Sequence, residues 1–320
     1  MTEPQSPTDR LVYTGDLAPL IARIAEAYGV GTPTDYSVIE VGYEDCNVII
    51  NTEQGRFLVK MFAKTRTSEE ITRYTNVMRK VVEAGVRHPE LMFANSEVVY
   101  TDSGVSLVLM RFIEGKTFFE LDRAPDEDER HAILEQAAKI NAIDYEPPYL
   151  FDSWAIPNIN ELLERVKQYV EPDDLVLVEQ VIAQYNTIPV DELPHCFVHG
   201  DFTKTNVLKG DDGNLYILDF SVANSYPRIQ ELAVIAANLL YDNKTPLQER
   251  CQIVADKYGQ LTELTEIERQ YLPVYALTGV AMEFLGAHLE KFSNGNDTEE
   301  TEYWLTLGRN GLRQALLVVE

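Results

Sequence analysis

Hydrophobic residues recur at helical spacing near the start of the chain and over most of its second half. This spacing places one apolar face on a helix whose end is marked by Gly29; its apolar positions are Leu17, Leu20, Ile21, Ile24, Ala25 and Tyr28. A second, more charged helix is predicted over residues 68–84. Ser68 is its expected N-cap, and two acidic residues in its first turn favour a helix start there.

Short runs rich in β-branched and aromatic residues predict strands in the first third of the chain. The expected strands are residues 38–41, 47–51, 57–62, 97–100 and 106–112. The first three follow one another through short turns, which predicts an antiparallel meander. The last two are expected to form another hairpin.

The rest of the chain is predicted to be mostly helical. The expected helices are residues 127–143, 158–170, 175–185, 229–241, 246–258 and most of 266–317. One β pair, residues 206–209 and 215–218, interrupts them. The pattern therefore predicts an α+β protein with a small antiparallel β lobe over residues 1–110 and a larger, mainly helical lobe over residues 111–320.

The net charge of the chain limits the classes of molecule that we expect it to bind. Its 320 residues contain 27 Lys and Arg against 52 Asp and Glu, a net charge of −25. Residues 111–320 carry most of this excess. Duplex nucleic acid and anionic membranes attract basic surfaces, so we expect neither as a partner. An acidic cleft would attract an acceptor that carries an ammonium group.

Cysteine usage and the N-terminal pattern predict the compartment. Cys46, Cys196 and Cys251 are odd in number, far apart and in no CxxC pair, which is typical of a protein in the reducing cytoplasm. The first ten residues lack the basic and apolar regions of a signal peptide. We expect no membrane-spanning segment, because no uninterrupted apolar run approaches the required length.

The residues that indicate chemistry lie around the predicted β pair, in His199-Gly-Asp201-Phe-Thr-Lys204-Thr-Asn206 and in Asp219-Phe220. An aspartate in the loop before a strand can accept a proton from a hydroxyl group. An asparagine at the start of that strand and an aspartate after its partner strand offer oxygen ligands of the kind that Mg²⁺ prefers. Phosphoryl transfer needs these parts together with a lysine for the phosphates.

This arrangement resembles the active-site signature of the aminoglycoside phosphotransferases and of related choline, homoserine and hydroxylysine kinases. The resemblance implies a bilobal, protein-kinase-like fold and ATP and Mg²⁺ as cofactors. It implies that Asp201 is the catalytic base and that Asn206 and Asp219 are the magnesium ligands. The segment from Asp219 to Ala233 is most similar in spacing to the homoserine-kinase-like branch.

The same resemblance implies a nucleotide site in the first part of the chain. Gly42 and Asn47 belong to a segment similar to the nucleotide-positioning loop, and Lys60 corresponds to the phosphate-binding lysine. Residues 109–115 resemble the hinge, with Met110, Phe112 and Ile113 near the adenine.

Several positions depart from the family pattern. Relatives place a glutamate on the inserted helix as the partner of the lysine, but this chain has Tyr74 there, and Glu70, one turn earlier, is a possible substitute. Glu231 replaces the usual aspartate and is expected to be structural. Asn141 stands where relatives often have histidine.

Two nearby side chains have alternative roles. His199 is expected to brace the catalytic loop through hydrogen bonds to the backbone rather than to bind metal. Lys204 could contact the transferred phosphoryl group or point into solvent.

We therefore predict an ATP- and Mg²⁺-dependent kinase that phosphorylates a hydroxyl group of a small molecule. A catalytically weak, nucleotide-binding pseudokinase is the alternative that the missing helix glutamate favours. A metallohydrolase with His199, Asp201, Asn206 and Asp219 as ligands is a second alternative. The sequence leaves open the acceptor (an amino alcohol, a homoserine-like amino acid, an aminoglycoside or a sugar), the choice between ATP and GTP, and the oligomeric state.

Overall fold

The computed structural model describes residues 6–40 and 44–316 and divides the chain into two compact units. The first unit contains Met1–Arg79 and His88–Glu114, and the second contains Lys80–Arg87 and Gly115–Glu320. The division thus falls after Glu114, whereas the sequence analysis placed it after residue 110. The expected α+β class is confirmed, because an antiparallel sheet dominates the first unit and helices dominate the second.

The first unit is built on one five-stranded antiparallel sheet with the strand order β1-β2-β3-β5-β4. Its strands are β1 (Pro33–Ile39), β2 (Cys46–Thr52), β3 (Gly55–Met61), β4 (Val99–Asp102) and β5 (Val105–Arg111). The predicted meander and the predicted hairpin join into this sheet because β3 pairs with β5.

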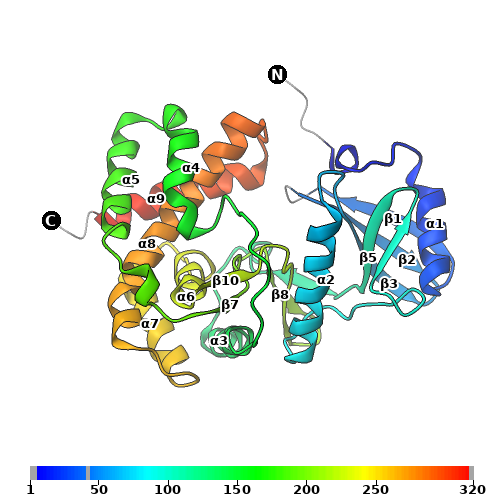
Figure 1. Cartoon of the computed structure of the whole chain (residues 1–320), viewed down its shortest axis with the longest axis horizontal. Coiled ribbons are helices and arrows are strands. Elements are labelled where there is room, and N and C mark those ends of the chain that lie inside the picture. Colours follow the sequence, from blue (N-terminus) through cyan, green and yellow to red (C-terminus); the bar gives the residue numbers. More distant parts are fainter. Residues whose placement is uncertain (1–5, 41–43, 317–320) are drawn as a thin grey trace. The chain divides into compact units, whose positions relative to one another are not determined.

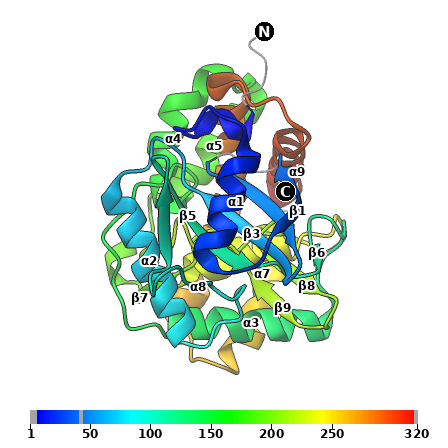
Figure 2. The same cartoon turned by 90° about the vertical axis from the view of Figure 1, so that its right-hand side faces the viewer.

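The two faces of this sheet have different roles. Helix α1 (Leu17–Tyr28) covers one face, as Figure 2 shows, and its apolar residues pack on Val48, Ile50, Phe57, Val59 and Met61. Asp16 caps the start of α1, and Gly29 ends it in the left-handed conformation, with φ 64°. Because strand residues alternate between faces, Leu58 and Lys60 project from the opposite face.

Helix α2 (Ser68–Glu83) lies on the face of the sheet opposite to α1 (Figure 1). The expected N-cap at Ser68 is wrong, because Thr67 caps this helix. The Thr67 hydroxyl accepts a hydrogen bond from the Glu70 N–H (3.2 Å), and the Glu70 carboxylate accepts one from the Thr67 N–H (2.7 Å). This reciprocal capping box satisfies two backbone donors at once.

The second unit is organised around a long central helix, α8, which packs on α4, α5, α6, α7 and α9 (Figure 1). Its α-helices are α3 (Glu127–Asn141), α4 (Ile159–Val166), α5 (Pro172–Tyr185), α6 (Ile229–Val234), α7 (Leu247–Gly259), α8 (Glu266–His288) and α9 (Glu299–Leu316). Two π-helical segments, η5 (Ile235–Leu239) and η6 (Leu289–Asn294), extend α6 and α8. Short 3₁₀ helices in the two units are η1 (Pro7–Arg10), η2 (Ile156–Asn158), η3 (Lys167–Tyr169) and η4 (Val190–Glu192).

The segment Glu266–Asn294 is long and apolar enough to cross a membrane by length and composition, with a mean hydropathy of 1.3. However, 89% of its most apolar stretch is buried inside the molecule. Such burial is typical of the core helix of a globular unit.

Two small β ladders hold the loops of the candidate site. Strands β6 (Gly115–Thr117), β8 (Val207–Gly210) and β9 (Leu215–Ile217) form one sheet in the order β6-β8-β9. Strands β7 (His195–Val198) and β10 (Asn224–Pro227) form the other. Only β8 and β9 were expected from the sequence. Residues 199–206 thereby connect the two ladders, and residues 218–223 connect them a second time.

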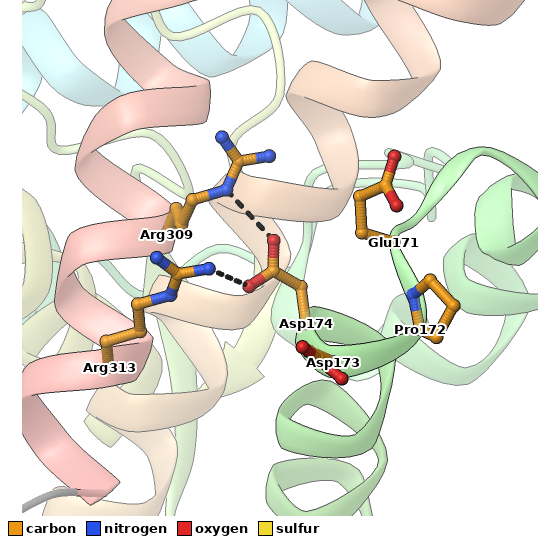
Figure 3. Close-up of a pocket in the computed structure, with 6 residues that line it drawn as sticks. All are labelled: Glu171, Pro172, Asp173, Asp174, Arg309 and Arg313. Atoms are coloured by element: carbon orange, nitrogen blue, oxygen red, sulfur yellow. Dashed lines mark hydrogen bonds and ion pairs between the residues drawn. The ribbon is translucent and has the colours of Figure 1, made fainter.

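Helix α9 is tied to the start of α5 by one buried carboxylate, as Figure 3 shows. Asp174 Oδ2 accepts a hydrogen bond from Arg309 Nε (2.9 Å), and its Oδ1 accepts one from Arg313 Nη2 (2.8 Å). The depression beside this pair is also lined by Glu171, Pro172 and Asp173. Charge-assisted hydrogen bonds of this kind fix the relative position of two helices.

Candidate active site

Asp201 and Asn206 lie in the loop between β7 and β8, and their side chains are in direct contact. Asn206 Nδ2 donates to Asp201 Oδ2 (2.6 Å) and to the Asp201 carbonyl oxygen (3.0 Å). The amide nitrogen of Asn206 therefore orients the Asp201 carboxylate. The amide oxygen of Asn206 is on the opposite side of its own amide group.

Asp219 follows β9 and has an unusual backbone conformation, with φ 52°. Its Oδ1 accepts hydrogen bonds from the Ser221 N–H (3.1 Å) and hydroxyl (2.5 Å). Burial, together with the negative charges of Asp152 and Asp219, raises the pKa of Asp201 to about 7. The structure thus brings Asp201, Asn206 and Asp219 into one cluster.

His199 braces this loop in its neutral form. Its Nδ1 accepts a hydrogen bond from the Asp201 N–H (3.1 Å), so Nε2 carries the proton and donates to the Leu218 carbonyl (2.8 Å). The ring lies near Phe202 and Phe220, and burial lowers the pKa of His199 to about 4. The expected bracing role is confirmed. Because both ring nitrogens are engaged by the backbone, His199 does not supply the ligand that a metallohydrolase would need.

Glu231, at the start of α6, supports the loop from the other side. Its two carboxylate oxygens accept hydrogen bonds from the N–H groups of His199 (2.9 Å) and Gly200 (3.3 Å). Gly200 has φ 88°, and a Cβ there would lie 3.1 Å from the Val222 carbonyl oxygen, so the turn requires glycine. Burial raises the pKa of Glu231 to about 7. The expected structural role of Glu231 is confirmed.

Lys204 turns into the interior of the second unit, so the alternative that it points into solvent is wrong. Its Nζ donates to the Tyr241 carbonyl (2.7 Å), and its backbone N–H donates to Asn238 Oδ1 (2.9 Å). Burial lowers the pKa of Lys204. The side chain therefore anchors the middle of the loop between β7 and β8.

Asn141, at the end of α3, links that helix to two neighbouring elements. Its Nδ2 donates to the Phe197 carbonyl in β7 (3.1 Å), and its Oδ1 accepts from the Tyr258 hydroxyl in α7 (2.9 Å). An asparagine at this position thus supports the strand that leads into the catalytic loop.

In the first unit, Lys60 and Asn47 occupy opposite positions on β3 and β2. Directly opposed residues of an antiparallel pair project from the same face, so both side chains are on the face away from α1. Lys60 Nζ lies 3.3 Å from Asp45 Oδ2 and 5.9 Å from the centre of the Tyr74 ring. Glu70 does not take the role of lysine partner, because its carboxylate caps α2 at Thr67.

Asp45 is the site residue that sequence reasoning missed. Its side chain is almost fully buried, and its Oδ1 also accepts from the Ala63 N–H (3.0 Å). No sequence signal identified Asp45, because its place depends on the register of the folded sheet, in which Cys46 pairs with Met61, the residue that follows Lys60. That register brings Asp45 to the end of the lysine strand.

The expected hinge residues lie at the end of β5. Met110 pairs with Leu58 and shares a face with Lys60. The Phe112 N–H donates to the Arg56 carbonyl (3.1 Å), and the Phe112 ring lies 4.1 Å from the Arg56 guanidinium carbon. Ile113 follows the strand and is half-buried. Gly42, the remaining predicted nucleotide-site residue, lies outside the described residues.

Known proteins share both the sequence pattern and the fold. Residues 35–264 match the phosphotransferase enzyme family. A homoserine kinase of Rhodopseudomonas palustris (strain BisB5) is 24% identical over 291 residues, which cover 88% of this chain and 86% of that protein. A homoserine kinase of Phenylobacterium zucineum (strain HLK1) is 25% identical over 279 residues, which cover 85% of each protein.

Solved structures support the same assignment of the fold. The crystal structure of a spectinomycin phosphotransferase in complex with ADP and spectinomycin has a TM-score of 0.71 at 11% identity, covering 95% of this chain and 98% of that chain. A choline/ethanolamine kinase family protein from Mesorhizobium loti has a TM-score of 0.63 at 14% identity, covering 88% of each chain. Because the family match spans most of the sequence, the chain belongs to the phosphotransferase enzyme family and is a small-molecule kinase with a protein-kinase-like fold.

Proposed function

We propose that this kinase transfers the γ-phosphoryl group of ATP, with Mg²⁺, to a hydroxyl group of a small acceptor that carries an amine. The observation that carries the proposal is the cluster of Asp201, Asn206 and Asp219. Homoserine is the first acceptor to test, because relatives aligned over most of this chain are named homoserine kinases. Choline, ethanolamine and aminoglycosides are the other candidates, and the acidic second unit favours all of them electrostatically.

Asp201 would orient the acceptor hydroxyl and accept its proton. Asn206 holds the carboxylate in place, and a pKa of about 7 suits proton transfer near neutral pH. Most of the rate enhancement would come from positioning and from charge stabilisation, as is typical of phosphoryl transfer.

The residues present fit a magnesium ion. With Asn206 Nδ2 engaged by Asp201, the amide oxygen is the atom that faces a ligand, and Asp219 adds a carboxylate. Mg²⁺ prefers such hard oxygen ligands. When bound, the ion would neutralise charge on the phosphates of the nucleotide.

The nucleotide is proposed to bind through residues of the first unit. Lys60 and Asn47 share one face of the sheet, and Lys60 would contact the phosphates. The backbone near Met110, Phe112 and Ile113 is proposed for the adenine, with Gly42 in the loop over the phosphates. Because the Phe112 N–H is used by Arg56, Ile113 is the better candidate for a backbone donor.

Asp45 weakens the pseudokinase alternative. That alternative was based on the missing glutamate partner of Lys60, and Asp45 supplies an acidic group 3.3 Å from the lysine nitrogen. An ion pair of this kind can hold the lysine ready for phosphate oxygens.

The proposal is tested by measuring ADP release with ATP and Mg²⁺ and one acceptor at a time: L-homoserine, choline, ethanolamine or kanamycin. We expect one of them to raise ADP release well above the rate with ATP alone. Asp201→Asn should then lower kcat by about 10²–10⁴-fold, the usual effect of losing a positioned proton acceptor. The matched control is Asp211→Asn, an exposed aspartate in the β8–β9 turn, which should keep wild-type rates. Near wild-type turnover in Asp201→Asn would contradict the assigned role.

A further inference from the structure

Glu283 lies in the middle of α8, and only one of its two carboxylate oxygens has a hydrogen-bond donor within the described part of the chain. The residue is 4% exposed. Its Oε1 accepts a hydrogen bond from Asn238 Nδ2 (2.7 Å), whereas its Oε2 is buried and has no hydrogen-bond partner within residues 6–40 and 44–316. A buried carboxylate oxygen without a donor is unfavourable and rare, which makes Glu283 Oε2 a candidate acceptor for a donor that binds from outside.

Glu283 is connected to the catalytic loop through one side chain. Asn238 donates to Glu283 and, through its Oδ1, accepts the backbone N–H of Lys204, three residues after Asp201. Asn238 lies in the π-helical segment η5, a type of helix that is frequent at functional sites. The carboxylate is therefore positioned relative to the loop that holds the proposed catalytic aspartate.

Lys204 and Arg250 lie near Glu283 but make their hydrogen bonds elsewhere, and Arg250 Nε is buried without a partner among the described residues. Lys204 Nζ donates to the Tyr241 carbonyl (2.7 Å), and Arg250 Nη1 donates to the Ala237 carbonyl (3.4 Å). Neither forms an ion pair with Glu283 in the part of the chain that the structure describes. The second oxygen of the carboxylate thus remains available to a cation from outside the chain.

Aromatic rings near Glu283 suit an organic cation. Burial and the negative charge of Glu283 both raise the pKa of Tyr303. The Tyr241 ring, whose pKa is raised in the same way, already lies 5.1 Å from the Arg250 guanidinium carbon. Tyr303 continues into an aromatic cluster with Phe119 (ring centres 4.9 Å apart) and Trp304 (4.8 Å). A carboxylate beside aromatic faces is a common environment for an ammonium group.

We propose that Glu283 is a specificity-determining residue whose Oε2 accepts a hydrogen bond from the ammonium group of the acceptor. The inference rests on the proposed function, because it assigns a subsite to the acceptor of that reaction. It also assigns Asn238 as a positioning residue that holds this subsite against the catalytic loop.

The test compares each amine with a matched acceptor that lacks the ammonium group. L-homoserine is paired with 4-hydroxybutanoate, and ethanolamine is paired with 1-propanol, because choline has no N–H group to donate. The assay is run at pH 8, where the Glu283 carboxyl is ionised. In Glu283→Gln, which keeps the Asn238 contact, KM for the active amine should rise by about 10–100-fold, with kcat and KM for ATP within about threefold. KM for the analogue that lacks the ammonium group should be the same in wild type and variant.

Glu290→Gln is the matched control. Glu290 is also buried, but it accepts hydrogen bonds from Asn294 Nδ2 (3.1 Å) and Asn296 Nδ2 (2.5 Å), so both its oxygens are engaged. This variant should leave KM for the amine unchanged even if it unfolds at a lower temperature. An equal rise in KM in both variants would mean that Glu283 acts only through stability, which would overturn the inference.

Binding to wild type provides a second measurement that does not require a folded variant. Isothermal titration should show the amine binding at least about tenfold more tightly than its analogue without the ammonium group. Equal affinity would overturn the inference, and ADP release with that analogue would in that case leave the kinase proposal intact. If no acceptor stimulates ADP release, the proposed function fails, and amine binding by wild type against Glu283→Gln still decides the role of Glu283.

Discussion

At the scale of single residues, the site separates into contacts that are local in the sequence and contacts that are not. Asp201 and Asn206 are five residues apart, and their hydrogen bond forms within one loop. In contrast, Glu231 reaches His199 across 32 positions, and Asp45 reaches Lys60 from the residue before β2. A pattern in the sequence indicates contacts of the first kind, whereas the pairing of distant elements decides those of the second kind.

The partner of Lys60 gives a prediction at this scale. Asp45→Asn should raise KM for ATP by about 10–100-fold, because the ion pair with the lysine is lost. The matched control is Glu70→Gln, which should leave KM for ATP unchanged, since Glu70 caps α2 at Thr67. Steady-state kinetics with varied ATP decide between them. A larger effect in Glu70→Gln than in Asp45→Asn would contradict the assignment of Asp45.

At the scale of elements, hydrophobic periodicity identified the long helices and most strands, but it missed the shortest pieces. β6, β7 and β10 contain three or four residues each, which is too short for a periodic signal. The π-helical segments η5 and η6 follow α-helices without any change of pattern. These short elements hold the catalytic loop and Asn238, so the parts that position the site are those with the weakest signal.

The tie between α5 and α9 gives a prediction at the scale of elements. Asp174→Asn should lower the free energy of unfolding by about 1–3 kcal/mol, because a buried carboxylate loses its charge-assisted bonds to Arg309 and Arg313. The adjacent exposed residue offers a control, Asp173→Asn, with an expected change below about 0.5 kcal/mol. Chemical denaturation measures both. Equal stability of the two variants would show that the pair in Figure 3 does not fasten these helices.

At the scale of the whole molecule, the excess of acidic residues includes carboxyl groups that are buried in the interior. Burial raises the pKa of three carboxyl groups in the second unit, Asp201, Glu231 and Glu283, each to about 7. Buried histidines shift in the other direction, as the lowered pKa of His199 shows. Each group makes the stability of the fold depend on pH through the difference between its folded and unfolded pKa.

The contribution of Glu283 to the pH dependence of stability can be measured separately by mutation. Its pKa is raised from 4.5 to about 7, so between these values the folded state keeps a proton that the unfolded chain releases. The stabilisation is complete at low pH and is lost as pH rises through about 7. Relative to wild type, Glu283→Gln should therefore gain about 1–3 kcal/mol of stability between about pH 5 and about pH 8. Urea unfolding at both pH values measures this, and a pH-independent difference would exclude a raised pKa.

The sequence alone determined the α+β class, the long helices, the family and the cluster of Asp201, Asn206 and Asp219. These features depend on residues that are close together in the chain, where spacing and chemical type are sufficient. Only the tertiary structure decided the partner of Lys60, the inward turn of Lys204 and the half-satisfied carboxylate of Glu283. These depend on strand register and on helix packing, which bring distant residues together and remove polar groups from water, and no local pattern encodes either.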